Sequence, residues 1–181
     1  MNPPHLESER LIIQPLRNTD AGSLFAIRSQ PDVVRFQSVM FENELEAQRF
    51  IQNHEGFDFG IPNTWFQLGI YLKQNEELIG DIGVHFLDKN IQTVEIGYTI
   101  APEHQRKGYA FETVSRMLAF FFTVPHTNMV IAVTEPQNHP SMQLLNKLGF
   151  AKSALESLPC PIEILPGDVI FTLSRPELET G

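Results

Sequence analysis

The chain has 181 residues, of which 42% are hydrophobic and 19% are charged, a composition typical of a folded globular protein. This length favours a single domain over residues 1–181. The formal net charge of -9 disfavours binding through an extended basic surface, so we expect no direct nucleic-acid partner.

The first part of the chain predicts one strand followed by helices. Residues 10–16 have the apolar content of a strand, and Pro15 indicates that it lies at an edge or ends there. Helices are expected where apolar residues recur at helical spacing. They begin at the N-cap candidates 18–20, at 32–36, and in the first part of 42–59.

From Thr64 onward the pattern changes to that of strands. Turn clusters of Gln-Asn-Glu and Asp-Lys-Asn separate three β-rich runs, which predicts an antiparallel meander at 65–73, 77–87 and 92–100. The next apolar residues share one helical stripe, which predicts an amphipathic helix covering that sheet. The stripe consists of Ala110, Val114, Met117, Leu118 and Phe121.

The last third of the chain adds a buried strand, a helix and two closing strands. The continuous apolar run 129–134 is typical of a buried, parallel strand. We expect a helix from about 138 to 148 with Gly149 as its C′ residue, then strands at 151–156 and 169–174. The predicted fold is α/β (α+β), with a mixed, mostly antiparallel central sheet of about seven strands flanked by helices.

A glycine-containing loop lies between the third strand of the meander and the helix after it. Unpaired amides at the start of a helix form an anion site, so we expect a phosphate cradle here. The alternative is that Gly108 only eases a turn and that Arg106 and Lys107 are solvated. The loop is neither a Walker A motif nor a G-x-G-x-x-G fingerprint. The candidate anion-binding residues are Gln105, Arg106, Lys107, Gly108, Tyr109 and Ala110.

The same loop resembles a known motif. Residues 105–110, Gln-Arg-Lys-Gly-Tyr-Ala, are similar to the Q/R-x-x-G-x-G/A coenzyme A loop of the GCN5-related N-acetyltransferases (GNAT). Residues 138–150 are similar to the N-x-x-S…K-L-G-F segment of the ribosomal-protein alanine acetyltransferase (RimJ/RimL-like) branch of that family. The segments 10–16, 31–35 and 168–173 resemble that branch as well, so the resemblance covers nearly the whole chain.

This resemblance implies a GNAT-like fold and direct transfer of an acetyl group from acetyl-CoA to an amine. It implies that a bulge splays the strand at 92–100 and exposes backbone groups of Thr99 and Ile100 to the pantetheine arm. Asn138 is expected to orient the same arm, to cap the following helix, or to do both. Two residues depart from the family pattern: Gln14 replaces a frequent Arg, and Leu145 replaces a Tyr that protonates the leaving thiolate in many members.

Glu95 is the candidate general base, because an amine must lose a proton before it attacks. Its place in an apolar strand favours partial desolvation, although at an exposed edge it is a plain surface charge. Ser141 is the second candidate catalytic residue and also a cofactor-binding residue. Its hydroxyl is expected to face the departing sulfur or the carbonyl oxygen, unless it is an ordinary first-turn serine.

Other reactive or aromatic residues carry weaker hypotheses. The histidines His54, His85, His104, His126 and His139 show no metal-ligand spacing, so we expect no metal site. Cys160 has no acid or histidine partner near it in sequence, which disfavours a covalent intermediate. Two sets of residues are candidates for the acceptor pocket: His85 with Phe86, and one of Phe57, Phe59 and Trp65.

The sequence therefore predicts an acetyl-CoA-dependent N-acetyltransferase acting on a primary amine, at a protein N-terminus or on a small molecule. One alternative is an acyl-CoA-binding sensor or subunit without turnover, and another is a nucleotide-binding interaction domain. The single cysteine fits a reducing cytoplasm, and no stretch approaches the roughly 20 apolar residues that span a bilayer. We thus expect a cytoplasmic protein without a membrane partner. A homodimer is implied only by the resemblance.

Overall fold

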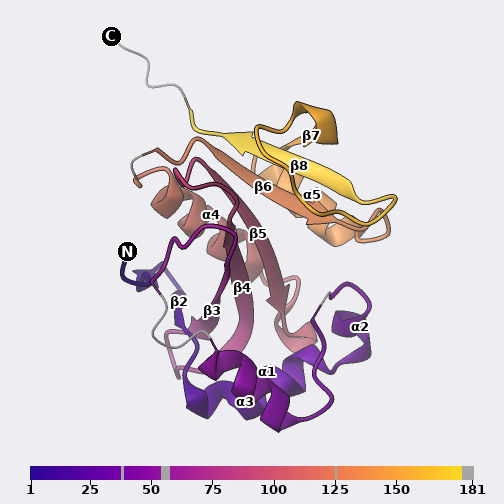
Figure 1. The fold of residues 1–181 in the computed structure, drawn as a ribbon. Helices are drawn as coiled ribbons and strands as arrows, with labels where there is room; N and C mark the ends of the chain where they lie inside the picture. The colour runs from indigo at the N-terminus through magenta and orange to yellow at the C-terminus, as the bar shows by residue number, and fades with distance from the viewer. Residues whose placement is uncertain (38, 54–57, 125, 177–181) are drawn as a thin grey trace.

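The computed structural model describes residues 1–37, 39–53, 58–124 and 126–176. Within them one sheet of eight strands runs in the order β1-β2-β3-β4-β5-β6-β8-β7 (Figure 1). Neighbouring strands pair antiparallel except β5 and β6, which are parallel. The strands are β1 Leu6–Glu7, β2 Leu11–Pro15, β3 Trp65–Leu72, β4 Leu78–Phe86, β5 Thr93–Ile100, β6 Met129–Thr134, β7 Ala151–Ser153 and β8 Val169–Ser174.

The predicted fold class is confirmed, with eight strands where about seven were expected. The extra strand is β1, whose two residues Leu6 and Glu7 pair with Ile13 and Ile12 of β2. A strand of two residues is too short to leave a periodic pattern in the sequence. The predicted parallel strand is confirmed in β6, which pairs with β5.

The described residues form five α-helices, and four of them cover the sheet in two groups (Figure 1). Buried side chains of α4 and α5 join the main core on one sheet face, together with Phe150 and Phe171. Side chains of α1 and α3 form a second cluster with Tyr71, Leu78 and Ala101, on the other side of the sheet. The helices are α1 Ala21–Arg28, α2 Pro31–Val34, α3 Glu44–Gln52, α4 Tyr109–Phe121 and α5 His139–Lys147.

The parallel pair β5 and β6 separates partway along its length. The two strands are paired only where Thr93–Glu95 lie beside Met129–Ile131. Beyond Glu95, β5 continues beside β4 alone, and β6 continues beside β8 alone. The register between β4 and β5 runs unshifted from Gly80↔Ile100 to Phe86↔Val94. The expectation that a bulge splays this strand is therefore wrong. Divergence of the two strands is what frees one edge of β5.

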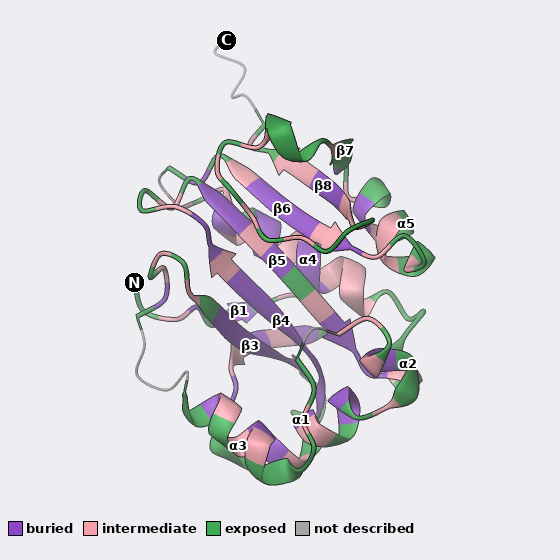
Figure 2. Cartoon of the chain, turned by 45° about the vertical axis from the view of Figure 1, so that its right-hand side comes forward, coloured by how far each residue is buried: buried purple, intermediate pink, exposed green. Residues whose placement is uncertain are grey.

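Alternation along β5 sends its side chains to two different environments. Val94, Ile96 and Ile100 are buried in the core beneath α4, and Tyr98 packs against the same core. The odd-numbered residues Glu95, Gly97 and Thr99 therefore project from the opposite face. Gly97 is exposed in the middle of that strand, as the green segment of β5 shows in Figure 2. The centre of this face is thus open to solvent.

None of the helices in the described ranges has the length and apolar character required to cross a membrane.

Candidate active site

The loop before α4 has the backbone conformation of an anion cradle. Gly108 caps the helix with φ of 87°, and Arg106 has φ of 59°, so both lie in the left-handed region. The first hydrogen bond of the helix is donated by the Glu112 amide to the carbonyl of the N-cap residue Gly108, at 3.0 Å. Helix geometry leaves the amides of Tyr109 and Ala110 without such a partner, at the positive end of the helix dipole.

Arg10 of the β1–β2 turn fixes this loop from the side. Its Nη1 donates to Lys107 O at 3.0 Å, and its Nε donates to Glu112 Oε2 at 2.7 Å. Its guanidinium lies 4.6 Å from the centre of the Tyr109 ring. In the sequence, Arg10 stands out only as part of the segment 10–16 that resembles the family, because nothing local connects it to a loop about a hundred residues away.

The amide groups on the free edge of β5 belong to the even-numbered residues. Thr93 O accepts a hydrogen bond from Leu87 N at 3.1 Å, and Ala101 N donates to Ile79 O at 2.8 Å. The backbone N–H and C=O groups of the odd-numbered residues of β5 therefore point toward β4. A Cβ on Gly80 would lie 2.1 Å from Thr99 O, which places that carbonyl against β4. The prediction that Thr99 offers its backbone to a ligand is therefore corrected. Tyr98 and Ile100 present their main chain to the free edge.

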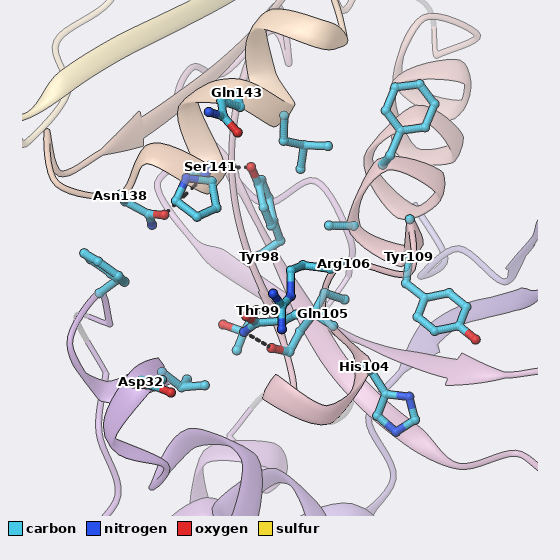
Figure 3. Close-up of a pocket in the computed structure, with 18 of the residues that line it drawn as sticks. Asp32, Tyr98, Thr99, His104, Gln105, Arg106, Tyr109, Asn138, Ser141 and Gln143 are labelled. Atoms are coloured by element: carbon cyan, nitrogen blue, oxygen red, sulfur yellow. Dashed lines mark hydrogen bonds between the residues drawn. The ribbon is translucent and has the colours of Figure 1, made fainter.

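A cavity of about 580 Å³ connects the free edge of β5 to the start of α4 and to α5. Every residue predicted to bind the cofactor lines it, apart from Lys107. Gln105 closes the loop onto the strand, since its Nε2 donates to Ile100 O at 2.9 Å. Thr99 also lines the cavity, and its hydroxyl accepts a hydrogen bond from Gln37 Nε2. Figure 3 shows Arg106, Gln105 and Thr99 on one side of this space and Asn138 and Ser141 on the other.

Asn138 and Ser141 are held together at the start of α5. Ser141 N donates to Asn138 Oδ1 at 3.2 Å, so Asn138 is the N-cap of the helix. Both residues also line the cavity. The capping role predicted for Asn138 is thus confirmed, and its amide nitrogen lies where it can contact a ligand.

Tyr98 is a site residue that sequence reasoning missed. Its hydroxyl lies 3.0 Å from Ser141 Oγ, and both side chains line the cavity (Figure 3). Burial raises the pKa of Tyr98 to about 12, against a smaller lowering by the Ser141 hydrogen bond. Leu145 is fully buried in the core and offers no hydroxyl. Strand alternation places Tyr98 on the α4 side, but which helix residue it meets depends on packing.

Glu95 lies on the opposite face of β5, outside this cavity. Its Oε2 is 3.0 Å from His85 Nδ1 on β4, and both side chains are mostly buried. Trp65 of β3 stacks on the His85 ring with centroids 4.9 Å apart, and Trp65 is itself 41% exposed. A carboxylate, an imidazole and an accessible aromatic ring are therefore grouped beside Gly97, at the open centre of the face.

The other candidates for the acceptor pocket are core residues or lie outside the described residues. Phe59 and Phe86 are fully buried core residues in edge-to-face contact, with ring centroids 4.9 Å apart. Phe57 and His54 lie outside the described residues. Among the residues that are described, no group of three or more His, Cys, Asp or Glu side chains could hold a metal ion. The absence of a metal from the reaction stays a prediction.

Cys160 is partly buried beside β6 and β8, in an apolar cluster with Leu87, Ile131 and Ile170. Burial raises the pKa of its thiol, against a hydrogen bond with Thr93 that lowers it. A raised thiol pKa disfavours the nucleophilic thiolate. This environment supports the view that Cys160 forms no covalent intermediate.

Comparisons with known proteins agree on one family. The acetyltransferase (GNAT) domain model matches residues 10–151. The chain is 33% identical to the uncharacterized N-acetyltransferase YoaA of Bacillus subtilis over 84% of this chain and 85% of that protein. It is 32% identical to the uncharacterized N-acetyltransferase p20 of Bacillus licheniformis, over 83% and 84%.

The fold is similar to that of solved acetyltransferase structures, and a further curated relative has lower identity. A GNAT-family acetyltransferase from Bacillus anthracis has a TM-score of 0.78 at 21% identity, covering 95% of this chain and 99% of that one. The microcin C7 self-immunity acetyltransferase MccE, solved with acetyl-CoA and AMP, has a TM-score of 0.74 at 17% identity, covering 92% and 93%. The [ribosomal protein uS5]-alanine N-acetyltransferase of Escherichia coli is 23% identical over 81% of this chain and 78% of that protein. The ribosomal-protein branch therefore stays a prediction.

Proposed function

Because the chain belongs to the acetyltransferase (GNAT) domain family, we propose that it transfers acetyl directly from acetyl-CoA to a primary amine, on a small molecule or at a protein N-terminus. The observation that carries this proposal is the cavity of about 580 Å³. It joins the amide cradle of α4 to the place where β5 and β6 separate. An extended ligand with a phosphate end and a reactive end fits such a passage.

The residues along the cavity fit coenzyme A by their chemistry. The amides of Tyr109 and Ala110 and the Arg106 guanidinium suit the diphosphate. Main-chain groups of Tyr98 and Ile100 suit the amides of the pantetheine arm, as an added strand would. Asn138 offers a further side-chain contact. Bound acetyl-CoA supplies the acetyl group as a reactive thioester.

The face opposite the cradle suits the acceptor amine. Glu95 is placed there to remove a proton from the amine, and its contact with His85 at 3.0 Å holds the carboxylate in one orientation. The open space over Gly97 gives an acceptor access to β5, since a Cβ built there would find only the Trp65 ring, 4.0 Å away. The net charge of -9 favours a cationic acceptor slightly.

A screen for released thiol tests the proposal. Purified protein is incubated with acetyl-CoA and with amines, polyamines, amino-acid derivatives and N-terminal peptides, including the alanine N-terminus of ribosomal protein uS5. We expect thiol release that depends on one acceptor class, with an acceptor heavier by one acetyl group by mass spectrometry. Absence of acetylated product across every class, despite measurable binding of coenzyme A, would contradict the proposal.

The alternative is a protein that binds acyl-CoA without turnover, and the buried Leu145 at the position of a frequent catalytic Tyr is what favours it. Glu95→Gln separates the two hypotheses. For an enzyme we expect kcat to fall about a hundredfold or more, because a general base contributes that much, with the Kd of coenzyme A unchanged. The matched control is Glu156→Gln, which removes the same charge from an exposed residue. Equal turnover in the two variants would exclude Glu95 as the base.

A further inference from the structure

The position that carries the thiolate acid in many family members is occupied here by a side chain that cannot donate. Leu145 is fully buried in the main core, so its place offers no hydroxyl and is closed to bulk solvent. A sulfur that departs with negative charge into a partly enclosed cavity needs a hydrogen-bond donor there. The inference below rests on the proposed function and concerns which residues supply that donor.

Two hydroxyls from different elements meet on the wall of the cavity. Tyr98 projects from the free part of β5, and Ser141 lies in the first turn of α5, with 3.0 Å between their oxygens (Figure 3). Ser141 is itself anchored, because its backbone amide donates to the Asn138 side chain at 3.2 Å. The pair therefore links β5 to the first turn of α5 on the cavity wall.

The direction of the hydrogen bond decides what each hydroxyl can do. Each hydroxyl has one hydrogen to donate. If Ser141 donated to Tyr98, no serine hydrogen would remain for a ligand. A phenol is the stronger donor of the two, so Tyr98 donating to Ser141 Oγ is the favourable arrangement. It leaves the Ser141 hydrogen free to turn toward the cavity.

We propose that Tyr98 is a positioning residue that donates its hydroxyl hydrogen to Ser141 and thereby directs the Ser141 O–H at the departing sulfur. Ser141 acts as a hydrogen-bond donor and keeps its proton. The acceptor nitrogen bonds to the acetyl carbon, the carbon–sulfur bond breaks with its electron pair left on sulfur, and Glu95 takes the proton of the amine. Solvent protonates the sulfur afterwards, so no further reactant is required.

The acidity of Tyr98 supports donation without proton transfer. Burial raises its pKa to about 12, whereas an ordinary thiol has a pKa of about 8.5. Moving the phenol proton to a thiolate would therefore be opposed by more than about a thousandfold. The hydroxyl stays protonated at every physiological pH and remains available as a donor.

Ionisation of the bound thiol tests this arrangement without turnover. A donor at the sulfur stabilises the thiolate, so the thiol of enzyme-bound coenzyme A should ionise at lower pH in the wild type than in Tyr98→Phe or Ser141→Ala. We expect a difference of about one pH unit, equal to a tenfold change in the ionisation constant, because hydrogen bonds to charged groups are worth that much. Ultraviolet absorbance of the thiolate during a pH titration measures it. Equal ionisation in all three proteins overturns the inference.

Binding of desulfo-coenzyme A, which lacks the sulfur, distinguishes this role from simple structural support. Tyr98→Phe should bind it as tightly as the wild type, while binding coenzyme A more weakly above the pH at which the thiol ionises. Equal losses for both ligands would mean that Tyr98 only shapes the cavity, which overturns the inference. Tyr71→Phe is the matched control, because Tyr71 belongs to the second cluster and donates its hydroxyl hydrogen to Asp20. This variant should leave the ionisation of the bound thiol unchanged.

Kinetics give a second, independent measurement. We expect Tyr98→Phe to lower kcat about tenfold with little change in the KM for acetyl-CoA. Because Tyr98 acts through Ser141, the double variant with Ser141→Ala should be no slower than Ser141→Ala alone. Additive losses would contradict the proposed chain of donors. Failure of wild-type protein to bind coenzyme A at all would instead refute the proposed function.

Discussion

Gly108 is the residue on which the shape of the anion cradle depends. Its φ of 87° is rarely adopted by other residues, and a Cβ at this position would approach Arg10 Nη2 to 3.3 Å. The same Cβ would stand where a phosphate meets the amides at the start of α4. The glycine-containing loop in the sequence already predicted an anion cradle here. The crowding against Arg10 follows only from the fold.

Gly108→Val is expected to weaken coenzyme A binding about tenfold or more, since loss of one charge-assisted hydrogen bond is enough for that. Isothermal titration calorimetry measures the Kd. Gly167→Val is the matched control, because Gly167 also has a positive φ, of 98°, but no atom within 4 Å of an added Cβ. It introduces comparable backbone strain away from the cradle. Equal affinity of the two variants would mean that the loop does not bind the diphosphate.

At the scale of elements, α4 combines an anion site with an acidic residue in its own first turn. Glu112 would repel a phosphate, but it is held by three donors: Ser8 Oγ, Arg10 N and Arg10 Nε, each at 2.7 Å. The hairpin of β1 and β2 thus neutralises this carboxylate and ties α4 to the sheet. The Arg10 guanidinium, which comes from the distant β1–β2 turn, allows the Glu112 carboxylate to remain beside the cradle.

The same contacts make stability depend on Glu112 ionisation. Burial favours a higher pKa for this carboxyl, but hydrogen bonds from the Arg10 amide, Ser8 and the Arg10 guanidinium outweigh it, so the pKa is lowered from 4.5. A lowered folded-state pKa contributes stability that is present above 4.5 and lost as pH falls through the folded value. We expect the free energy of unfolding, measured with urea, to fall less steeply below this pH in Glu112→Gln than in the wild type. Glu156→Gln should keep the wild-type slope, and a wild-type slope in Glu112→Gln would contradict the assignment.

At the scale of the whole molecule, a buried ion pair joins the group of α1 and α3 to the sheet beneath the acceptor face. Asp81 of β4 is fully buried and accepts from Arg28 of α1 and from Gln67 of β3. The Arg28 guanidinium also lies 5.8 Å from the Phe41 ring and 5.5 Å from the Phe50 ring. This cluster fixes α1 and the segment after α2 against β4, next to the strand that carries Thr99.

Asp81→Ala is expected to lower the free energy of unfolding by about 3–5 kcal/mol, because it leaves Arg28 buried without its counter-charge. Chemical denaturation measures the change. The control is Glu76→Ala, which breaks the ion pair between Glu76 and Arg17. Because the Glu76 side chain is 70% exposed, this variant should lower the free energy of unfolding by less than about 1 kcal/mol. Similar costs for the two variants would show that the buried pair adds nothing beyond a surface contact.

The sequence by itself determined the elements and the loop. Strand and helix periods, the Gly108 turn and the Asn138 cap are encoded within a few neighbouring residues, and most elements lie close to the predicted bounds. The strand predicted at 151–156 is the exception, since it ends at Ser153 and is followed by a 3-10 helix. The tertiary structure alone decided which side chains meet. Tyr98 and Ser141 are 43 residues apart and Arg10 and Glu112 are 102 apart, so packing of separate elements brings them together. Local periodicity determines the face of an element on which a residue lies. Only the way the elements pack determines which residue it contacts.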